Sequence, residues 1–372
     1  MPDRIARLAI VLACASLLAA SGSAQAPLIA SRKLAAPLPA PKSGLRVLIY
    51  HDMEGLAGED DPNQFRFNHP DAYPKGQELL VADINTVVAG LYDGGATSVD
   101  VVDAHGSGNP EPDVRRDLLD KRAEQVVRDK PFRQYVDIVE PNKYDAVVAV
   151  GMHAKTGSRG FASHTYTIGM DIIMNGQPIT ESELVGYSWG RVGVPLIMVT
   201  GDDRLRADLK TMPWLEYVVT KRATSASTVE LRPVDQVHAD MRAAAKRALE
   251  RRSQAKSMAL TTPIRAALHA VPPASLEPLK DVPGINYHDN QVDFVAKDFA
   301  AAYDGVVGLI GVATLSYSRL MMEIVRARPD AKTLLLENAD LLFKRWMDVE
   351  SGRWTAPVAA APMAGKKYHG AN

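Results

Sequence analysis

Three short apolar runs in this chain each lead into residue types that bind metal ions. Each run has the length and the β-branched residues expected of a buried parallel strand. The runs and the candidate ligands that follow them are 46–50 with Asp52 and Glu54, 98–102 with His105, and 146–150 with His153. Ligands bind beyond the carboxyl ends of strands in open α/β sheets, so these side chains are expected at one sheet edge. Carboxylates and imidazoles gathered there predict a site for zinc or a similar divalent ion, and the metal in turn suggests hydrolysis.

Each segment, taken alone, also has an ordinary structural explanation. Asp52 and Glu54 leave the same face of extended backbone, so one carboxylate could bridge two cations, but for these two residues alone a solvated acidic loop is a slightly better explanation. Asp103 could accept the second ring N–H of His105, or the pair could simply form a polar turn. The joint pattern is more specific than any one part, and its lack of cysteine is typical of catalytic rather than structural zinc.

Further candidates follow along the chain. His164 lies eleven residues after His153, and two such imidazoles could divide metal binding and proton transfer between them. Lys155 is either a surface cation or a group that binds a substrate carboxylate. Glu181 and Glu183 open a predicted helix, where the helix dipole favours acidic residues, although one of them could be a fifth metal ligand. The remaining histidines show no pairing with another candidate ligand: His51, His69, His238, His269, His288 and His369.

Composition excludes some function classes and indicates export. The 372 residues are 46% hydrophobic and 23% charged, which is ordinary for a globular protein. The formal net charge of −1 and the lack of a basic stripe give no indication of nucleic-acid binding. Arg4 and Arg7 precede an apolar stretch over 8–20 that is too short to span a bilayer, which predicts a signal peptide over 1–26 and a periplasmic or secreted protein. The only cysteine, Cys14, lies inside it, and no later segment predicts a membrane span.

The pattern of elements predicts an α/β fold. We expect a mixed, largely parallel sheet with helices on both faces and a smaller C-terminal α+β lobe. The predicted helices span 77–92, 115–129, 181–191, 234–252 and 331–349, the later strands span 194–200, 263–270 and 291–296, and Asn175-Gly176 forms the turn of a hairpin over 172–179. The predicted organisation is a signal peptide (1–26), a linker (27–44), a metal-binding α/β core (45–225), a C-terminal lobe (226–350) and a flexible tail (351–372).

Several segments together resemble the D-aminopeptidase family, peptidase family M55. They occur in the family's order: Asp52-Met53-Glu54-Gly55, Asp103-Ala104-His105-Gly106, His153-Ala154-Lys155-Thr156-Gly157, His164-Thr165-Tyr166, Asn175-Gly176 with Glu181, Gly193-Val194-Pro195 with Gly201-Asp202-Asp203, and Val282-Pro283-Gly284. The resemblance covers about residues 45–320. It implies an aminopeptidase with two Zn²⁺ per subunit that acts on short peptides with an N-terminal D-residue such as D-Ala. It also implies a homo-oligomer, a ring-shaped decamer.

The resemblance also implies roles for individual residues. Asp52 would bridge both metals, Glu54 and His105 would ligate one, and His153 and Glu181 would ligate the other. His164 would be the catalytic histidine of a reaction in which the two ions activate a water.

The chain departs from the family pattern in two places. Tyr50 stands where the family usually has Ser, and Glu183 could replace Glu181 as the fifth ligand. Two alternatives remain: another exported metallo-amidase or esterase acting on cell-wall fragments, and a non-catalytic protein that binds metal or peptide.

Overall fold

The computed structural model describes residues 44–272, 274–337, 340, 365 and 367–370. The predicted signal peptide, nearly all of the linker and most of the tail therefore lie outside the described residues. Of the helix predicted over 331–349, residues 331–337 are helical and most of the rest is likewise outside them.

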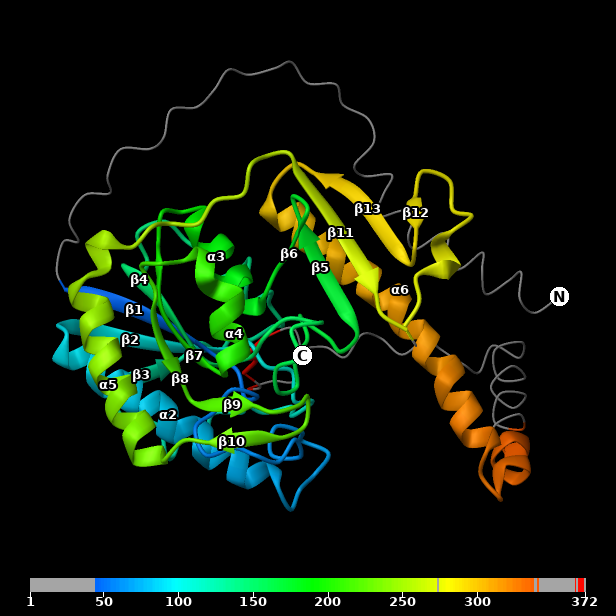
Figure 1. The fold of residues 1–372 in the computed structure, drawn as a ribbon, viewed down its shortest axis with the longest axis horizontal. Coiled ribbons are helices and arrows are strands. Elements are labelled where there is room, and N and C mark those ends of the chain that lie inside the picture. Colours follow the sequence, from blue (N-terminus) through cyan, green and yellow to red (C-terminus); the bar gives the residue numbers. More distant parts are fainter. Residues whose placement is uncertain (1–43, 273, 338–339, 341–364, 366, 371–372) are drawn as a thin grey trace.

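A six-stranded parallel sheet carries the site (Figure 1). Its strands in spatial order are β3 (Ala123–Gln125), β2 (Ala96–Asp103), β1 (Leu45–His51), β4 (Ala146–Met152), β7 (Leu196–Gly201) and β8 (Glu216–Val219). All neighbouring strands are parallel, and β1 lies between β2 and β4. The carboxyl ends of the three predicted ligand-bearing strands are therefore side by side, as expected.

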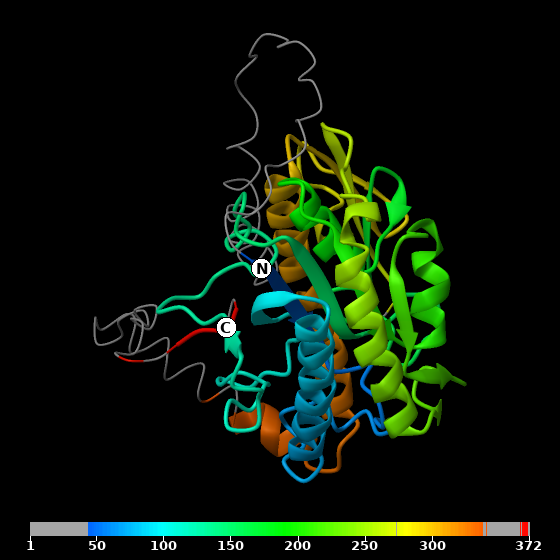
Figure 2. The ribbon, with the colours of Figure 1, turned by 90° about the vertical axis from the view of Figure 1, so that its left-hand side faces the viewer.

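Helices cover both faces of this sheet. They are α2 (Tyr73–Asp93), α3 (Glu181–Gly190), α4 (Asp203–Asp208) and α5 (Val234–Glu250), whereas α6 (Phe299–Arg326) packs on the smaller sheet described below. Successive side chains of a strand point to opposite faces, so Val47 and Ile49 pack in the apolar core with α2 and α5, which lie side by side in Figure 2. Leu48 and Tyr50 enter the other core, with Trp189 of α3. The predicted α/β class is confirmed.

The chain also forms a smaller, five-stranded antiparallel sheet. Its order is β12 (Asn286–His288), β13 (Gln291–Ala296), β11 (Ile264–Ala270), β5 (Met170–Met174) and β6 (Gln177–Pro178), while β9 (Lys221–Ala223) and β10 (Val229–Leu231) form a separate pair. Asn175 and Gly176 have φ of 50° and 81°, and positive φ at both positions suits the predicted hairpin turn. Because β5 and β6 of the smaller sheet lie between β4 and β7 of the larger sheet in the sequence, the two sheets interleave along the chain.

Hydrophobic periodicity alone does not predict α6, the longest helix, whose last turns extend beyond both sheets in Figure 1. Gly305, Gly308 and Gly311 lower the helix propensity of its sequence. Tertiary packing explains one of them, because a β-carbon at Gly305 would lie 2.5 Å from the Phe294 ring of β13. The glycine lets the helix approach the small sheet closely.

The charged helix predicted over 115–129 is wrong. The chain forms turns there and then β3, which adds an edge strand beside β2. The Asp120 carboxylate accepts the backbone N–H of Arg122 at 2.9 Å, and the Asn85 side chain accepts that of Asp120 at 2.7 Å. Such side-chain bonds satisfy backbone donors that a helix would otherwise use.

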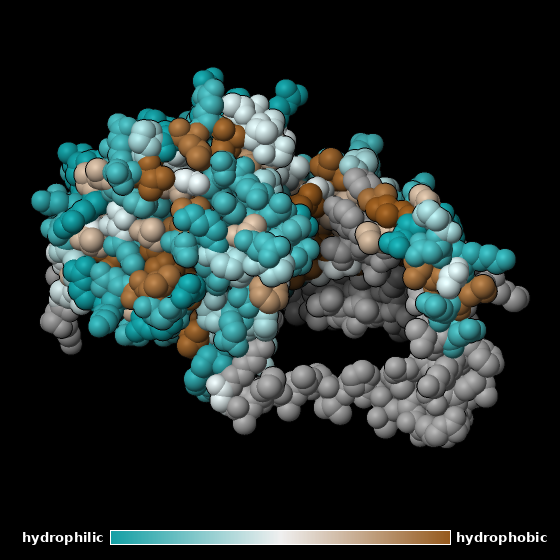
Figure 3. Space-filling view, turned by 90° about the horizontal axis from the view of Figure 1, so that it is seen from below, coloured by the Kyte–Doolittle hydropathy of each residue, from teal (hydrophilic) through white to brown (hydrophobic). Residues whose placement is uncertain are grey.

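The described surface is mixed in character. Figure 3 shows that on one face hydrophilic side chains predominate and apolar side chains gather in small, separate patches. Within the described part of the chain, no helix combines the length and apolar character that a bilayer crossing requires.

Candidate metal centre

Two glycines bring the loop after β1 against the end of β4. The backbone N–H of Gly55 donates to the Gly151 carbonyl at 2.8 Å. A β-carbon at Gly55 would lie 2.0 Å from the carbonyl oxygen of Met152, and one at Gly151, where φ is 72°, would lie 2.3 Å from that of Asp52. No larger residue fits either position without backbone movement. This close approach places Asp52 beside His153.

Asp52 lies between two imidazoles. Its Oδ1 is 2.9 Å from Nδ1 of His105, and its Oδ2 is 3.3 Å from Nε2 of His153. Glu54 Oε2 lies 3.1 Å from the same nitrogen of His105, and Glu181 Oε1 lies 3.5 Å from that of His153. None of the five side chains is more than 8% exposed. The structure thus joins all five predicted ligands, called the metal cluster below, into two sets that share Asp52.

Backbone carbonyls orient the imidazoles of this region. His105 Nε2 lies 2.8 Å from the Phe65 carbonyl oxygen, and His153 Nδ1 lies 3.0 Å from the carbonyl of the next residue. His164 Nδ1 lies 2.7 Å from the carbonyl oxygen two residues before it. A carbonyl only accepts hydrogen bonds, so these nitrogens carry the protons. In the neutral imidazoles, the opposite nitrogens of His105 and His153 then direct lone pairs at the carboxylates.

This arrangement calls for a cation between imidazole and carboxylate. Oδ2 of Asp52 and Nε2 of His153 are buried and have no hydrogen-bond partner. Burial alone would lower the pKa of His105, but the carboxylates of Glu54 and Asp52 raise it well above its usual range. Without a metal, a proton on the His105 imidazole would therefore occupy the space between imidazole and carboxylates that a cation would otherwise take. Buried carboxylate and imidazole donors with unpartnered atoms fit a divalent ion such as zinc.

The hydrogen bonds at the start of α3 give Glu181 and Glu183, the two candidates for the fifth ligand, different roles. Thr180 caps the helix in a capping box, in which the Glu183 carboxylate accepts the Thr180 backbone N–H at 2.8 Å. Glu181 instead turns to the metal cluster, where it also accepts the backbone N–H of Tyr166 at 2.7 Å. The structure therefore places Glu181, and not Glu183, among the candidate ligands.

His164 adjoins the cluster. Its ring stacks on that of His153 with centroids 4.1 Å apart and planes 14° apart, and its Nε2 is 3.8 Å from Glu181 Oε1. The side chain is 15% exposed and lines a pocket. His164 therefore has a nitrogen near the metal cluster, and a small molecule in the pocket could reach its side chain.

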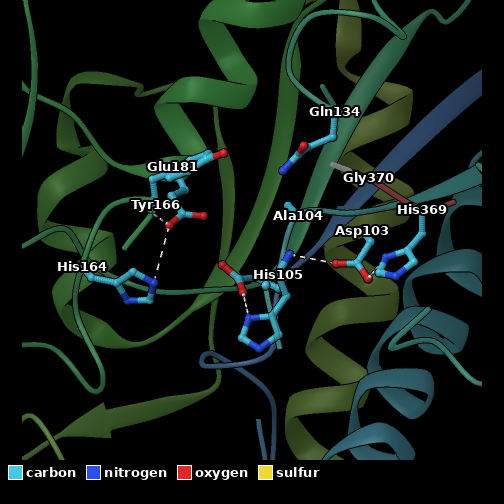
Figure 4. A pocket seen from close by; sticks show the side chains of 11 residues that line it. Asp103, Ala104, His105, Gln134, His164, Tyr166, Glu181, His369 and Gly370 are labelled. Carbon is cyan, nitrogen blue, oxygen red and sulfur yellow. Dashed lines mark hydrogen bonds and ion pairs between the residues drawn. The ribbon is translucent and has the colours of Figure 1, made fainter. Parts of the chain in front are cut away.

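That pocket, of about 190 Å³, opens over the metal cluster (Figure 4). Asp52, His105, His164 and Glu181 line it. Other parts of the chain contribute Asp103, Gln134, Tyr166, His369 and Gly370. Neither lysine nor arginine is among the described residues that line it, so the chain supplies few cations of its own there.

The prediction that Asp103 accepts the ring N–H of His105 is wrong, because the Phe65 carbonyl occupies that position. Asp103 Oδ1 accepts the backbone N–H of His105 at 2.9 Å, and its Oδ2 lies 2.8 Å from Nδ1 of His369. His51 Nε2 is 3.9 Å from the same oxygen. Sequence reasoning gave His51 and His369 no partner, because nothing local relates position 369 to position 103.

The structure gives no support to a substrate-binding role for Lys155. Its ammonium forms an ion pair with Asp208 and lies 3.4 Å from the Ser158 hydroxyl. It does not line the pocket. A residue two positions beyond His153 is simply turned toward α4, so closeness in sequence to a ligand did not indicate closeness to the pocket.

The chain is similar to known proteins in both sequence and fold. The family model for D-aminopeptidase, peptidase family M55, matches residues 45–307. A D-aminopeptidase of Bacillus subtilis (strain 168) is 26% identical over 276 residues, which cover 72% of this chain and 98% of that protein.

A solved structure also matches, described as "Zn-dependent D-aminopeptidase DppA from Bacillus subtilis, a self-compartmentalizing protease". It superposes with a TM-score of 0.66 at 22% identity, covering 73% of this chain and 98% of that one, which supports the fold. The family model spans most of the chain and includes all five residues of the metal cluster. The chain therefore belongs to the D-aminopeptidase family, peptidase family M55, as its sequence motifs predicted.

Proposed function

We propose that this protein is an exported zinc-dependent aminopeptidase that hydrolyses short peptides with an N-terminal D-amino acid of the D-Ala type. The observation that carries the proposal is the position of Asp52, whose two carboxylate oxygens face two different ligand sets. Membership of the D-aminopeptidase family supports the reaction class.

Two ions per subunit fit the paired sets. Asp52 would bridge them, Glu54 and His105 would complete one site, and His153 and Glu181 the other. Bound zinc supplies Lewis-acid polarisation of a carbonyl and lowers the pKa of a water. The chain's contribution is to hold five donors in a buried pocket and to fix the orientation of the imidazoles through backbone carbonyls.

His164 is the proposed catalytic residue. Its Nδ1 proton is committed to a backbone carbonyl, so Nε2 is the nitrogen that accepts and returns a proton. In the pocket it would stabilise the developing oxyanion or pass a proton to the leaving amine. The stacking of its ring on His153 would hold it beside the reacting peptide bond.

Substrate type, assembly and location are proposed on different grounds. The matched Bacillus subtilis protein is a D-aminopeptidase, and the description of the solved structure names a self-compartmentalizing protease, which together support a D-specific homo-oligomer. The resemblance of the motifs suggests a decamer. The predicted signal peptide supports a periplasmic or secreted location, which fractionation of the native host would test, and light scattering of the purified protein would test the assembly.

The decisive experiment combines metal analysis with a substrate panel. We expect two zinc ions per subunit and hydrolysis of D-Ala-D-Ala and D-Ala p-nitroanilide in preference to the L-Ala compounds. A chelator should abolish hydrolysis and zinc should restore it. Hydrolysis of N-blocked amides or esters with no preference for a free D-residue would instead favour the metallo-amidase alternative. Full metal occupancy without turnover of any compound would favour the non-catalytic alternative.

A further inference from the structure

Residues 367–370, called the C-terminal segment below, form part of the wall of the pocket. They lie beyond residues 45–307, which the family model matches. Tyr368 pairs with Arg128 as an antiparallel bridge, with N–H to carbonyl distances of 2.6 and 2.5 Å. The Gly370 carbonyl accepts the backbone N–H of Phe132 at 3.0 Å. Figure 2 shows the segment, in red at the label C, beside this part of the chain.

Side chains also fix the C-terminal segment. Tyr368 and His369 are only 9% and 6% exposed, and Lys367 forms an ion pair with Asp129. His369 Nδ1 lies 2.8 Å from Asp103 Oδ2, the carboxylate that holds the His105 backbone N–H. These four residues were predicted to belong to a flexible tail. In the structure their backbone and side chains are paired with the pocket loops.

The position of the C-terminal segment limits the room for a substrate. His369 and Gly370 line the same cavity as Asp52 and His105. In Figure 4 they lie on the other side of His105 from His164 and Glu181. The cavity of about 190 Å³ is smaller than the roughly 300–1,000 Å³ of pockets that hold drug-sized ligands. A peptide whose reacting bond lay beside His164 and that extended across the pocket past His105 would meet this wall.

We propose that the C-terminal segment determines substrate length, restricting hydrolysis to peptides of two or three residues by closing the pocket opposite His164. This inference rests on the proposed aminopeptidase function and names a determinant that the matched region of the family does not include. His369 anchors the wall through Asp103, and Gly370 forms its surface. A β-carbon at Gly370 would meet only Gln134 Oε1, at 3.9 Å, so a larger side chain there would narrow the pocket without a backbone clash.

The first test removes the C-terminal segment. A chain that ends at residue 366 is compared with the full chain and with a control that ends at Gly370. The substrates are D-Ala-Gly and D-Ala-Gly-Gly-Gly. We expect the tetrapeptide-to-dipeptide ratio of kcat/KM to rise at least about 10-fold in the shortened chain and to stay constant in the control. Calorimetric binding of both peptides in a His164→Ala background should show the same shift in the ratio of Kd values.

The second test narrows the pocket and does not depend on the shortened chain folding. We expect Gly370→Leu to lower kcat/KM for D-Ala-Gly-Gly at least about 10-fold more than for D-Ala-Gly. Circular dichroism and zinc content establish that each variant is folded and loaded. Unchanged length ratios in folded, zinc-loaded variants would overturn the inference and leave the aminopeptidase proposal standing. Failure of the full chain to hydrolyse either peptide would instead overturn the proposed function.

Discussion

Two groups of buried carboxylates occur near the ligand-bearing loops, and their charges are balanced in different ways. In the metal cluster, three carboxylates face imidazole nitrogens with no lysine or arginine among them. In the second group, called the internal ion pairs, each carboxylate has a cationic partner from the chain. Glu59 pairs with Lys221, both 0% exposed, and Asp83 Oδ1 lies 2.8 Å from His238 Nε2.

The difference distinguishes a structural carboxylate from a metal ligand. Lys221 Nζ also contacts the Glu59 carbonyl at 3.1 Å and lies 4.3 Å from the centroid of the Phe161 ring, so the cation itself is fully surrounded. Asp52, by contrast, faces only imidazole nitrogens, and its buried Oδ2 has no hydrogen-bond partner. Oε1 of Glu59 also lacks a hydrogen-bond partner, but the Lys221 ammonium pairs with the other oxygen of that carboxylate. Burying an uncompensated charge is costly, so the metal cluster requires a cation from solution whereas the internal ion pairs do not.

The largest effect is expected from Asp52→Asn, which removes the shared carboxylate. Both ligand sets lose the charge that faces their histidine, so metal affinity should fall at least about 100-fold and turnover should be lost with it. Metal content after dialysis and hydrolysis of D-Ala-D-Ala would measure this. Asp60→Asn changes an exposed neighbour and is the matched control, which should retain both the bound metal and the hydrolytic activity. Two ions per subunit in the Asp52→Asn variant would contradict the bridging role.

His164→Ala should separate proton transfer from metal binding. We expect turnover to fall by about 10²- to 10⁴-fold, the usual contribution of a general acid or base, while metal content stays at the wild-type value. Steady-state kinetics and metal analysis on the same preparation test this, and His288→Ala, far more exposed, is the control. Loss of an ion from the His164→Ala protein would show instead that this histidine is a ligand, as its closeness to Glu54 and His153 allows.

Lys221→Met should break an internal ion pair and leave the metal cluster intact. Removing one partner of a buried pair leaves the other charge unpaired, so the free energy of unfolding should fall by about 3–5 kcal/mol. Urea denaturation in the presence of a chelator would measure it independently of bound metal.

The double variant Glu59→Met/Lys221→Met is the matched control for this prediction. It removes both charges and should recover most of the lost stability. A double variant no more stable than Lys221→Met would mean that packing against Phe161, rather than charge balance, explains the effect.

Local sequence patterns were sufficient for the ligands on the large sheet. Asp52, His105 and His153 each follow an apolar run directly, and the geometry of parallel strands brings such positions to one edge. Local patterns were not sufficient for Glu181, because the preference for acidic residues at the start of a helix explains both Glu181 and Glu183. Only the observed capping box shows which of the two is free to face the cluster.

Long-range contacts were beyond these patterns. His369 reaches Asp103 across most of the chain, and no periodicity or motif connects them. The edge strand β3 was mistaken for a helix because its charged sequence has no alternation, and pairing with β2 determines its conformation. Tertiary context overrides local propensity in both cases.

The smallest expected effect on the free energy of unfolding concerns His238, the partner of Asp83 in the internal ion pairs. Its dependence on pH has a definite direction. The hydrogen bond to Asp83 raises the pKa of His238 above 6.5, and burial raises that of Asp83 above 3.8. A histidine whose pKa is raised by folding stabilises the protein fully below its unfolded pKa, and this contribution is lost as the pH rises through the folded pKa. His238→Gln should therefore lower the free energy of unfolding by about 1 kcal/mol near pH 6.5 and by less near pH 9. Urea denaturation at both pH values, with His69→Gln as control, measures the difference. A cost that grows with pH would mean that His238 acts as a neutral donor and that Asp83 obtains its charge balance elsewhere.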